Sequence, residues 1–234
     1  MKFLFRPQKL IKYVGHLRVR FFNSGPFINS YHMFENNLIS FQPNVIIMKQ
    51  HFRQILRARR DRLTQAEVTE KSKMITDALI QSDLFEKSGS LFAYLDIGNE
   101  VQTRPLIEHC FKIKKPVFVP VTRDGEMFFA PLHDFSDLVE AGYGISEPIN
   151  PVAAEPDENA LFIIPGIGFD KHGSRIGYGA GFYDKYLHCR SDVHLVGICF
   201  EIQMTDELPK EKTDVRMDAV LTEKRWVIVD KKGR

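Results

Sequence analysis

The chain has 234 residues, which is enough for one domain or two with a substantial buried core. Residues 1–48 hold six Lys/Arg and one acid, Glu35, a net charge of +5, whereas residues 49–234 carry −3 from 26 basic and 29 acidic side chains. Because the basic excess is confined to the first segment, the charge of the remainder gives no reason to expect a nucleic-acid partner. The three cysteines form no CxxC pair, which indicates reduced thiols rather than a disulfide framework.

Residues 1–47 differ in composition from the rest and are interpreted as a leader. Few acids and scattered Lys/Arg are typical of a mitochondrial presequence. The sparse Ser and the many Phe and Asn residues are not typical of one. No apolar run approaches the roughly 18 residues of a transmembrane helix, so we expect no membrane partner. We favour translation from Met48, which would leave residues 1–47 untranslated or disordered. We therefore expect a single domain over residues 48–234 and a cytoplasmic location, with a mitochondrial one if the leader is a presequence.

The first predicted helix covers residues 49–62. Phe52 and Leu56 fall near one apolar stripe at helical spacing. Four basic residues share another face, at steps of four, four and three: Lys49, Arg53, Arg57 and Arg60. We interpret residues 57–62 as a solvated basic face. For Lys49 and Arg53, the sequence alone does not decide whether the side chains face solvent or contact a ligand.

The rest of the chain alternates helices with apolar runs. Thr64 and Glu67 form a capping box that predicts a helix to about Ser82, and a further helix is expected from Thr103, whose hydroxyl is a candidate cap. Strands are predicted at residues 91–95, 116–121, 127–132, 161–164 and 193–200, and after Thr213. Residues 134–141 are predicted as a short helix ended by Gly142, and residues 146–159 as a surface connection. Continuous apolar strands between helices predict an α/β fold with a mostly parallel sheet buried on both faces.

Residues 161–187 read as a strand, a glycine-rich turn and the start of a helix. Glycines let the backbone approach a phosphate closely, and a helix N-terminus adds partial positive charge. Lys171 and Arg175 would add full charges, and Asp184 could hold Mg²⁺. The spacing matches neither GxxxxGK[ST] nor GxGxxG. A tightly packed structural turn is the alternative, which would need the glycines but not these three charged residues together.

A fixed-gap motif over residues 165–184 closely resembles the signature of the 5-formyltetrahydrofolate cyclo-ligases: Pro165-Gly166-x-Gly168-Phe169-Asp170-x-x-Gly173-x-Arg175-Ile176-Gly177-x-Gly179-x-Gly181-Phe182-Tyr183-Asp184. The resemblance extends over residues 48 to about 222. It implies a three-layer αβα fold similar to that of sugar-phosphate isomerases and CoA transferases. Ala180 stands where some members have lysine, so the resemblance leaves the charge at this point to Lys171 or Lys49.

The resemblance also implies a reaction, namely ATP- and Mg²⁺-dependent conversion of 5-formyltetrahydrofolate to 5,10-methenyltetrahydrofolate with release of ADP and phosphate. The formyl oxygen would be phosphorylated and N10 would attack the formyl carbon. The resemblance implies catalytic roles for Arg175 and Tyr183, and it implies that Asp184 and Asp214 bind Mg²⁺. ATP contacts fall on Lys49, Gln50, His51, Phe52 and Arg53, and on Arg175, Ile176, Gly177, Tyr178, Gly179, Ala180, Gly181, Phe182 and Tyr183. Folate contacts fall on Leu95, Glu100, Tyr178, Gly179, Ala180, Gly181 and Phe182.

Two other classes of function stay open at this point. A sugar-phosphate isomerase or CoA transferase on the same fold would need neither ATP nor Mg²⁺. A catalytically silent nucleotide or folate binder is the second class, and a nucleic-acid binder using residues 49–62 would show a steep salt dependence of RNA binding. We expect the chain to act on ATP and 5-formyltetrahydrofolate as a monomer. Taken alone, Glu100 would be a helix-start carboxylate.

Overall fold

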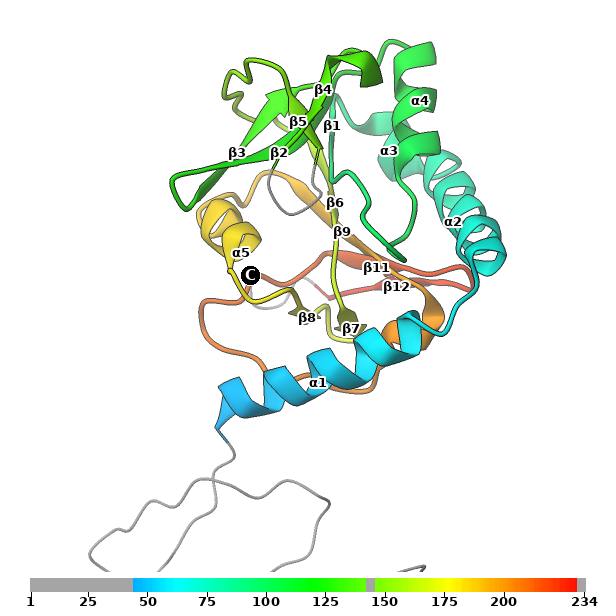
Figure 1. Ribbon diagram of the computed structural model, residues 1–234, viewed down its shortest axis with the longest axis vertical. Coiled ribbons are helices and arrows are strands. Elements are labelled where there is room, and N and C mark those ends of the chain that lie inside the picture. The colour runs from blue at the N-terminus through cyan, green and yellow to red at the C-terminus, as the bar shows by residue number, and fades with distance from the viewer. Residues whose placement is uncertain (1–43, 142–145, 231–234) are drawn as a thin grey trace, which may run out of the picture. The chain divides into compact units, whose positions relative to one another are not determined.

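The computed structural model describes residues 44–141 and 146–230, so most of the predicted leader, residues 1–43, lies outside the described residues. The central sheet is built from β1 (Leu91–Ala93), β2 (Val117–Arg123), β3 (Glu126–Pro131), β6 (Leu161–Ile164), β9 (His194–Ile198), β11 (Ala219–Leu221) and β12 (Trp226–Ile228). These strands lie in the order β12-β11-β9-β6-β1-β2-β3 (Figure 1). Neighbours are parallel except at the two edges, where β12 and β3 run antiparallel to the strand beside them.

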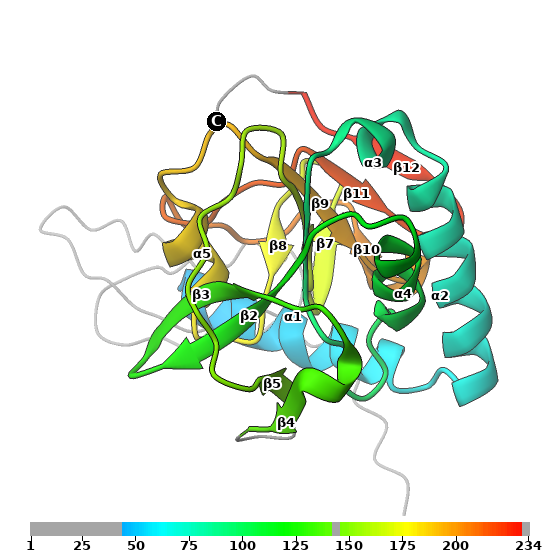
Figure 2. The ribbon, with the colours of Figure 1, turned by 90° about the horizontal axis from the view of Figure 1, so that it is seen from above.

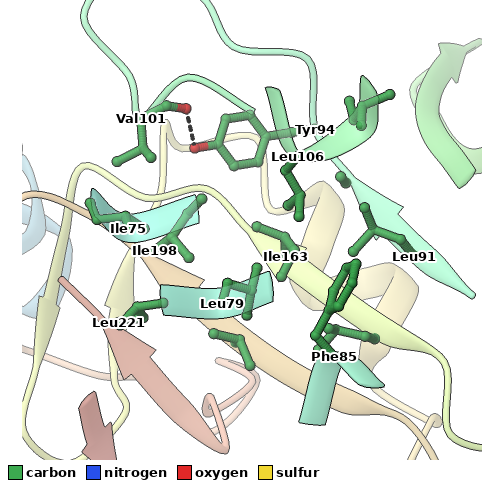
Figure 3. Close-up of a cluster of buried hydrophobic side chains, with 14 of the residues drawn as sticks. Ile75, Leu79, Phe85, Leu91, Tyr94, Val101, Leu106, Ile163, Ile198 and Leu221 are labelled. Carbon is green, nitrogen blue, oxygen red and sulfur yellow. Dashed lines mark hydrogen bonds between the residues drawn. The ribbon is translucent and has the colours of Figure 1, made fainter. Parts of the chain in front are cut away.

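One face of the sheet is covered by α2 (Gln65–Ile80), α3 (Asp83–Lys87) and α4 (Arg104–Lys112). Alternate strand positions point toward these helices because successive side chains of a strand face opposite sides. Leu91, Ile163 and Ile198 pack here with Ile75 and Leu79 of α2 (Figure 3). Each fully buried side chain of this size contributes roughly 1.5–3 kcal/mol by leaving water.

The opposite face is covered by α5 (Phe182–Leu187). Phe92 and Phe162 of neighbouring strands stack with ring centroids 4.3 Å apart, and Phe129 meets Phe92 edge-on at 5.2 Å. Leu187 of α5 closes this second cluster. Helices therefore lie on both faces of a mostly parallel sheet, which confirms the predicted α/β class (Figure 2).

The chain leaves β1 and β6 toward opposite faces, although these two strands are neighbours. From β1 it continues through α4 to β2, and from β6 through α5 to β9. Such a switch point opens a crevice at the carboxyl ends of the strands, where ligands of open α/β sheets bind. Here the loop after β1 carries Glu100 and the loop after β6 carries the glycine-rich stretch.

Two hydrogen bonds fix the loop after β1. The Tyr94 hydroxyl donates to the Val101 carbonyl at 2.8 Å (Figure 3). The Thr103 hydroxyl donates to the Tyr94 carbonyl at 2.7 Å. The prediction that Thr103 caps α4 with its side chain is wrong, because the hydroxyl is used in this loop. Its role is to tie both ends of the Glu100 loop together.

A small three-stranded sheet consists of β7 (Gly168–Asp170), β8 (Arg175–Ile176) and β10 (Met204–Thr205). The first helix, α1 (Val45–Arg60), packs against β7 and β8 of this sheet and lies beside them in Figure 1. Leu56 is fully buried against Ile167, Ile176 and Leu208. The helix includes Val45, Ile46 and Ile47, so the predicted boundary of the ordered domain at Met48 was too late.

The structure confirms the predicted start of α2 but not the helix predicted over residues 134–141. The capping box is confirmed, because the Thr64 hydroxyl accepts from the Glu67 amide and Glu67 accepts from the Thr64 amide. The helix predicted over residues 134–141 is wrong, because a 3-10 turn at Phe135–Asp137 leads into β4 (Leu138–Glu140). That strand pairs with β5 (Ser146–Pro148), which lies in the predicted surface connection, and Gly142 falls outside the described residues. No helix within residues 44–141 and 146–230 is long and apolar enough to cross a membrane.

Candidate active site

The glycine-rich stretch is a short hairpin followed by an exposed loop. β7 and β8 pair antiparallel across a turn at residues 171–174, where the sequence predicted a polar turn alone. Asp170 is buried and forms this turn, since one carboxylate oxygen accepts from the amides of His172 and Ser174 at 2.9 and 2.8 Å. Its other oxygen accepts from the Leu208 amide at 2.9 Å. Asp170 therefore has a structural role.

The loop over residues 177–181 connects β8 to α5 at the surface. Gly179 and Gly181 have φ values of 115° and 71°, which a side chain would strain. Tyr178, Gly179 and Ala180 are exposed. The backbone at this point is thus open to a ligand, and its shape depends on glycine.

Helix α1 reaches this loop with Arg53. The Arg53 Nε donates to the Gly177 carbonyl at 2.8 Å. Lys49, one turn earlier on the same face, is buried and donates to Asp214 at 2.6 Å and Glu211 at 2.8 Å. Burial alone would lower the pKa of Lys49, but the hydrogen bonds with Asp214 and Glu211 outweigh it and the pKa is raised. Lys49 and Arg53, left open by the sequence, both face the glycine-rich loop and its acidic neighbours.

Arg175 and Asp184 form the second charged pair. The Arg175 guanidinium donates to Asp184 Oδ1 at 3.0 Å and to the Pro165 carbonyl at 3.3 Å, and it lies 5.4 Å from the centroid of the Tyr183 ring. Tyr183 packs with Phe129 of β3, and burial raises the pKa of its hydroxyl well above its usual value.

Asp184 and Asp214 come together although they are far apart in sequence. Asp184 Oδ1 accepts from the amide of Val215, the residue that follows Asp214, at 3.1 Å. Mg²⁺ commonly takes one or two carboxylates from a protein, and waters and phosphate oxygens complete its coordination shell. The described residues hold no cluster of three or more His, Cys, Asp or Glu side chains arranged for a metal.

Glu100 lies on the other side of the glycine loop. It is 5% exposed, and its carboxylate accepts from the Tyr178 hydroxyl and from the Ile97 amide at 3.1 Å. Burial raises the pKa of Glu100, and the two hydrogen bonds oppose this. Burial and the neighbouring Glu100 carboxylate raise the pKa of Tyr178 to about 12.

Arg60 was assigned to a solvated face, and that interpretation is wrong for this residue. Its side chain is 7% exposed, it donates from NH1 to the Tyr178 hydroxyl at 3.0 Å, and the same nitrogen lies 3.8 Å from Glu100 Oε1. Arg57 and Arg59 are exposed, as expected. The sequence did carry a signal, because Arg60 shares a helix face with Lys49 and Arg53.

Comparison with known proteins identifies the family. The profile of the 5-formyltetrahydrofolate cyclo-ligase family matches residues 45–223. The chain belongs to this family. It is 29% identical over 177 residues to the 5-formyltetrahydrofolate cyclo-ligase of Escherichia coli K12, covering 72% of this chain and 96% of the relative. It is 27% identical over 189 residues to that of Mus musculus, covering 75% and 93%.

A solved structure gives the same result. The 5,10-methenyltetrahydrofolate synthetase of Aquifex aeolicus superposes with a TM-score of 0.70 at 28% identity, covering 80% of this chain and 95% of that one. The family to which this chain belongs consists of enzymes that convert 5-formyltetrahydrofolate to 5,10-methenyltetrahydrofolate. The resemblance stated from residues 165–184 is confirmed, and the sugar-phosphate isomerase and CoA transferase alternatives are set aside.

The other residues implied by the cyclo-ligase resemblance fall into three groups. Tyr178, Gly179, Ala180, Gly181 and Phe182 lie along the loop and the start of α5. The side chains of Phe52, Leu95 and Ile176 pack in hydrophobic clusters, so any contact they make with a ligand is in addition to a core role. Gln50 and Lys171 are exposed and His51 is half-buried.

Gln203 supports the site and was missed from the sequence. Its side-chain amide donates to the carbonyls of Gly166 and Ile167 at 3.1 and 2.9 Å, and its side-chain oxygen accepts from the Phe200 amide at 3.0 Å. It therefore fixes the chain as it leaves β6. Nothing in the local sequence distinguishes it from a surface glutamine.

Proposed function

We propose that this chain catalyses the closure of 5-formyltetrahydrofolate to 5,10-methenyltetrahydrofolate at the expense of ATP, with Mg²⁺, releasing ADP and phosphate. The observation that carries the proposal is the convergence of α1 on the glycine loop. Arg53 holds the Gly177 carbonyl, and Lys49 lies against Asp214, beside the chain that contacts Asp184. A binding site for a polyphosphate needs cations, open backbone and metal-holding acids together, and these three features meet here.

The phosphate side of the site is defined as Lys49, Arg53, Arg175, Asp184, Glu211 and Asp214. Without ligand its cations and acids are paired with one another. On binding ATP, the cations would turn to phosphate oxygens while Asp184 and Asp214 hold the metal. Mg²⁺ held by these two carboxylates would help to neutralise the negative charge of the phosphates.

The chemical difficulty is that a formyl oxygen is a poor leaving group. Transfer of the γ-phosphoryl group to that oxygen breaks the terminal phosphoanhydride bond and leaves ADP. N10 then bonds to the formyl carbon, and the C–O bond breaks with departure of inorganic phosphate. Such transfer depends mainly on alignment and on stabilising the negative charge of the transferring group. Arg175, a buried cation of the phosphate side, would stabilise that charge.

The folate side is defined as Leu95, Glu100, Tyr178 and Phe182. A carboxylate can accept two adjacent N–H donors, and the edge of a pterin offers such a pair. Glu100 is the buried carboxylate on this side, across Tyr178 from the phosphate side. It would fix the ring while Tyr183 and Phe182 provide walls.

The direct test is to incubate the full chain with 5-formyltetrahydrofolate, Mg²⁺ and ATP and to follow the near-ultraviolet absorbance of the methenyl product. We expect turnover that stops when ATP is omitted or Mg²⁺ is chelated. Turnover without ATP, or none under any condition, would contradict the proposal. Arg59→Ala, which removes an exposed cation of α1, is the matched control and should remain active.

We further propose that the enzyme acts as a monomer in the cytoplasm, with a mitochondrial location as the alternative. A relative from Arabidopsis thaliana is named as mitochondrial, which supports the alternative. Imaging of the full chain against a version starting at Met48, each with a C-terminal tag, would decide between them. Sedimentation of the purified full chain would give the oligomeric state.

A further inference from the structure

One buried charge on the folate side is not explained by the proposed chemistry. Arg60 ends α1, and its guanidinium lies beneath the glycine loop rather than in solvent. NH1 donates to the Tyr178 hydroxyl, which in turn donates to Glu100. The three side chains form a relay from a permanent cation through a phenol to a carboxylate, across three segments remote in sequence.

Arg60 and Glu100 lie side by side in the interior, around a gap too small for a water molecule. Tyr94, Val101, Gly166, Ile198 and Gln203 surround the same gap. Arg60 Nε is buried, makes no hydrogen bond among the described residues and lies 4.0 Å from Asp61 Oδ1. The hydrogen bond of the guanidinium is made by NH1, which meets both Tyr178 and Glu100.

We propose that Arg60 is a positioning residue for the folate ring: it holds the Tyr178 hydroxyl and keeps the Glu100 carboxylate ionised and correctly placed. The inference rests on the proposed function, because it assigns to Glu100 the recognition of the pterin. It adds a residue that acts through Glu100 and Tyr178.

The electrostatics of the cluster support this role. The titratable groups that interact with Glu100 are Tyr94 and Asp96 from the loop after β1, Tyr178 from the glycine loop, Tyr183 from α5 and Arg60 from α1. Arg60 is the cation among them, and its charge favours the ionised carboxylate, whereas Asp96 opposes it. Removing the guanidinium would leave a buried carboxylate with neutral or acidic neighbours, which favours its protonated form. A protonated Glu100 cannot accept two donors at once.

The packing explains why the residue must be arginine. Its NH1 lies 3.0 Å from the Tyr178 hydroxyl, and its guanidinium carbon lies 6.0 Å from the centroid of the same ring. A lysine ammonium is a point charge that cannot reproduce the planar fork of donors. Arg60→Lys should therefore restore charge but only part of the position.

The test compares Arg60→Leu, Arg60→Lys and the exposed control Arg59→Leu in the full chain. Binding of 5-formyltetrahydrofolate without ATP, KM for each substrate, kcat and thermal unfolding are measured between about pH 6 and 8.5. We expect Arg60→Leu to weaken 5-formyltetrahydrofolate binding by about tenfold, the equivalent of one pKa unit at Glu100, with a larger loss at low pH. KM for ATP should change by less than about twofold, and Arg60→Lys should recover part of the loss.

Three results would overturn the inference. Arg60→Leu could behave like Arg59→Leu, it could raise both KM values equally, or its loss could be independent of pH. If Arg60→Leu does not fold, Tyr178→Phe interrupts the relay at an exposed residue and should weaken folate binding alone; an unchanged affinity would then count against the relay. A wild-type chain that binds and turns over neither substrate would refute the proposed function and this inference together, whereas an active wild type with an unaffected Arg60→Leu would refute only the inference.

Discussion

The phosphate side and the folate side of the site hold charge in opposite ways. On the phosphate side, Lys49 contacts two acids, Asp214 and Glu211, and the side chain of Glu211 is 45% exposed. On the folate side, Glu100 is almost fully buried, and Arg60 lies 3.8 Å from it and also donates to the Tyr178 hydroxyl that Glu100 accepts from. On one side the acids of the ion pairs are partly exposed, and on the other the cation and the acid are both buried.

The difference matches what each side would have to bind. On the phosphate side the acids are partly exposed while Lys49 and Arg175 are buried, so water can solvate the acids as the cations turn to a phosphate. A buried carboxylate cannot lose its partner without a large penalty, so it must be placed before the ligand binds. We therefore expect substitutions on the phosphate side to act on ATP or on kcat, and those on the folate side to act on 5-formyltetrahydrofolate.

The largest effect is expected for Arg175→Ala. If Arg175 stabilises charge on the transferring phosphoryl group, kcat should fall about 10²-fold or more while KM for ATP changes much less. Steady-state rates with each substrate varied would measure this. Arg59→Ala, which removes an exposed arginine, should leave kcat unchanged. An unchanged kcat with a raised KM for ATP would reduce Arg175 to a binding residue.

Glu100→Gln should raise KM for 5-formyltetrahydrofolate by about 10- to 100-fold and leave KM for ATP nearly unchanged, because one buried acceptor pair is lost. The pH dependence gives a sharper signature. Since the pKa of Glu100 is raised by burial, the wild-type KM for folate should rise as pH falls through that raised value. The glutamine variant should lack this acid limb. A limb that persists in the variant would assign it to another group.

Lys49→Met should raise KM for ATP by about tenfold with little change for 5-formyltetrahydrofolate, since one phosphate-binding cation is lost. It should also lower the melting temperature. The pKa of Lys49 is raised in the folded protein, so its contribution to stability is fully present below the ordinary lysine pKa of about 10.4 and is lost as pH rises through the raised value. Melting curves of wild type and variant should therefore converge only at high pH, and a gap that closes below about pH 9 would contradict this assignment.

The strands and the glycine-rich loop could be predicted from the sequence, because each is specified by residues close together in the chain. Continuous apolar runs fixed the strands at Leu91, Val117 and Leu161 within a few residues, and the glycine series located the loop. The shared helix face grouped Lys49 with Arg53 but did not show whether they meet solvent or a ligand. Each of these signals depends on neighbours in the chain, where periodicity and turn chemistry apply.

The parts that were missed depend on long-range packing. Arg60 shares a helix face with Lys49 and Arg53, but only the fold brings it to Tyr178 and Glu100. Asp170 looks like a charged turn residue until Leu208 donates to it. Residues 134–141 carry helix-compatible side chains, but pairing of β4 with β5 overrides that preference. Such outcomes are decided by partners tens of residues away and leave no periodic trace.

The smallest effect on activity is expected for a change in the frame of the phosphate side. Gly173 has φ of 79° in the turn before Arg175, and a Cβ there would lie 2.6 Å from the Met217 carbonyl oxygen. Gly125 has nearly the same φ, 81°, but a Cβ there would meet open space. Gly125→Ala should cost about 1–2 kcal/mol of unfolding free energy from backbone strain, and Gly173→Ala about 1–3 kcal/mol more from the clash.

Urea denaturation of both variants measures this difference in unfolding free energy directly. The backbone strain is common to both variants, and only Gly173→Ala adds the steric clash. Because the turn positions β8, Gly173→Ala should also raise KM for ATP about twofold and leave KM for 5-formyltetrahydrofolate unchanged, whereas Gly125→Ala should alter neither. If the two alanine variants lose equal stability, the turn at Gly173 can shift to relieve the clash without a cost in free energy. If KM for folate moves with KM for ATP, the two sides share one frame, and the separation drawn from their ion pairing does not hold.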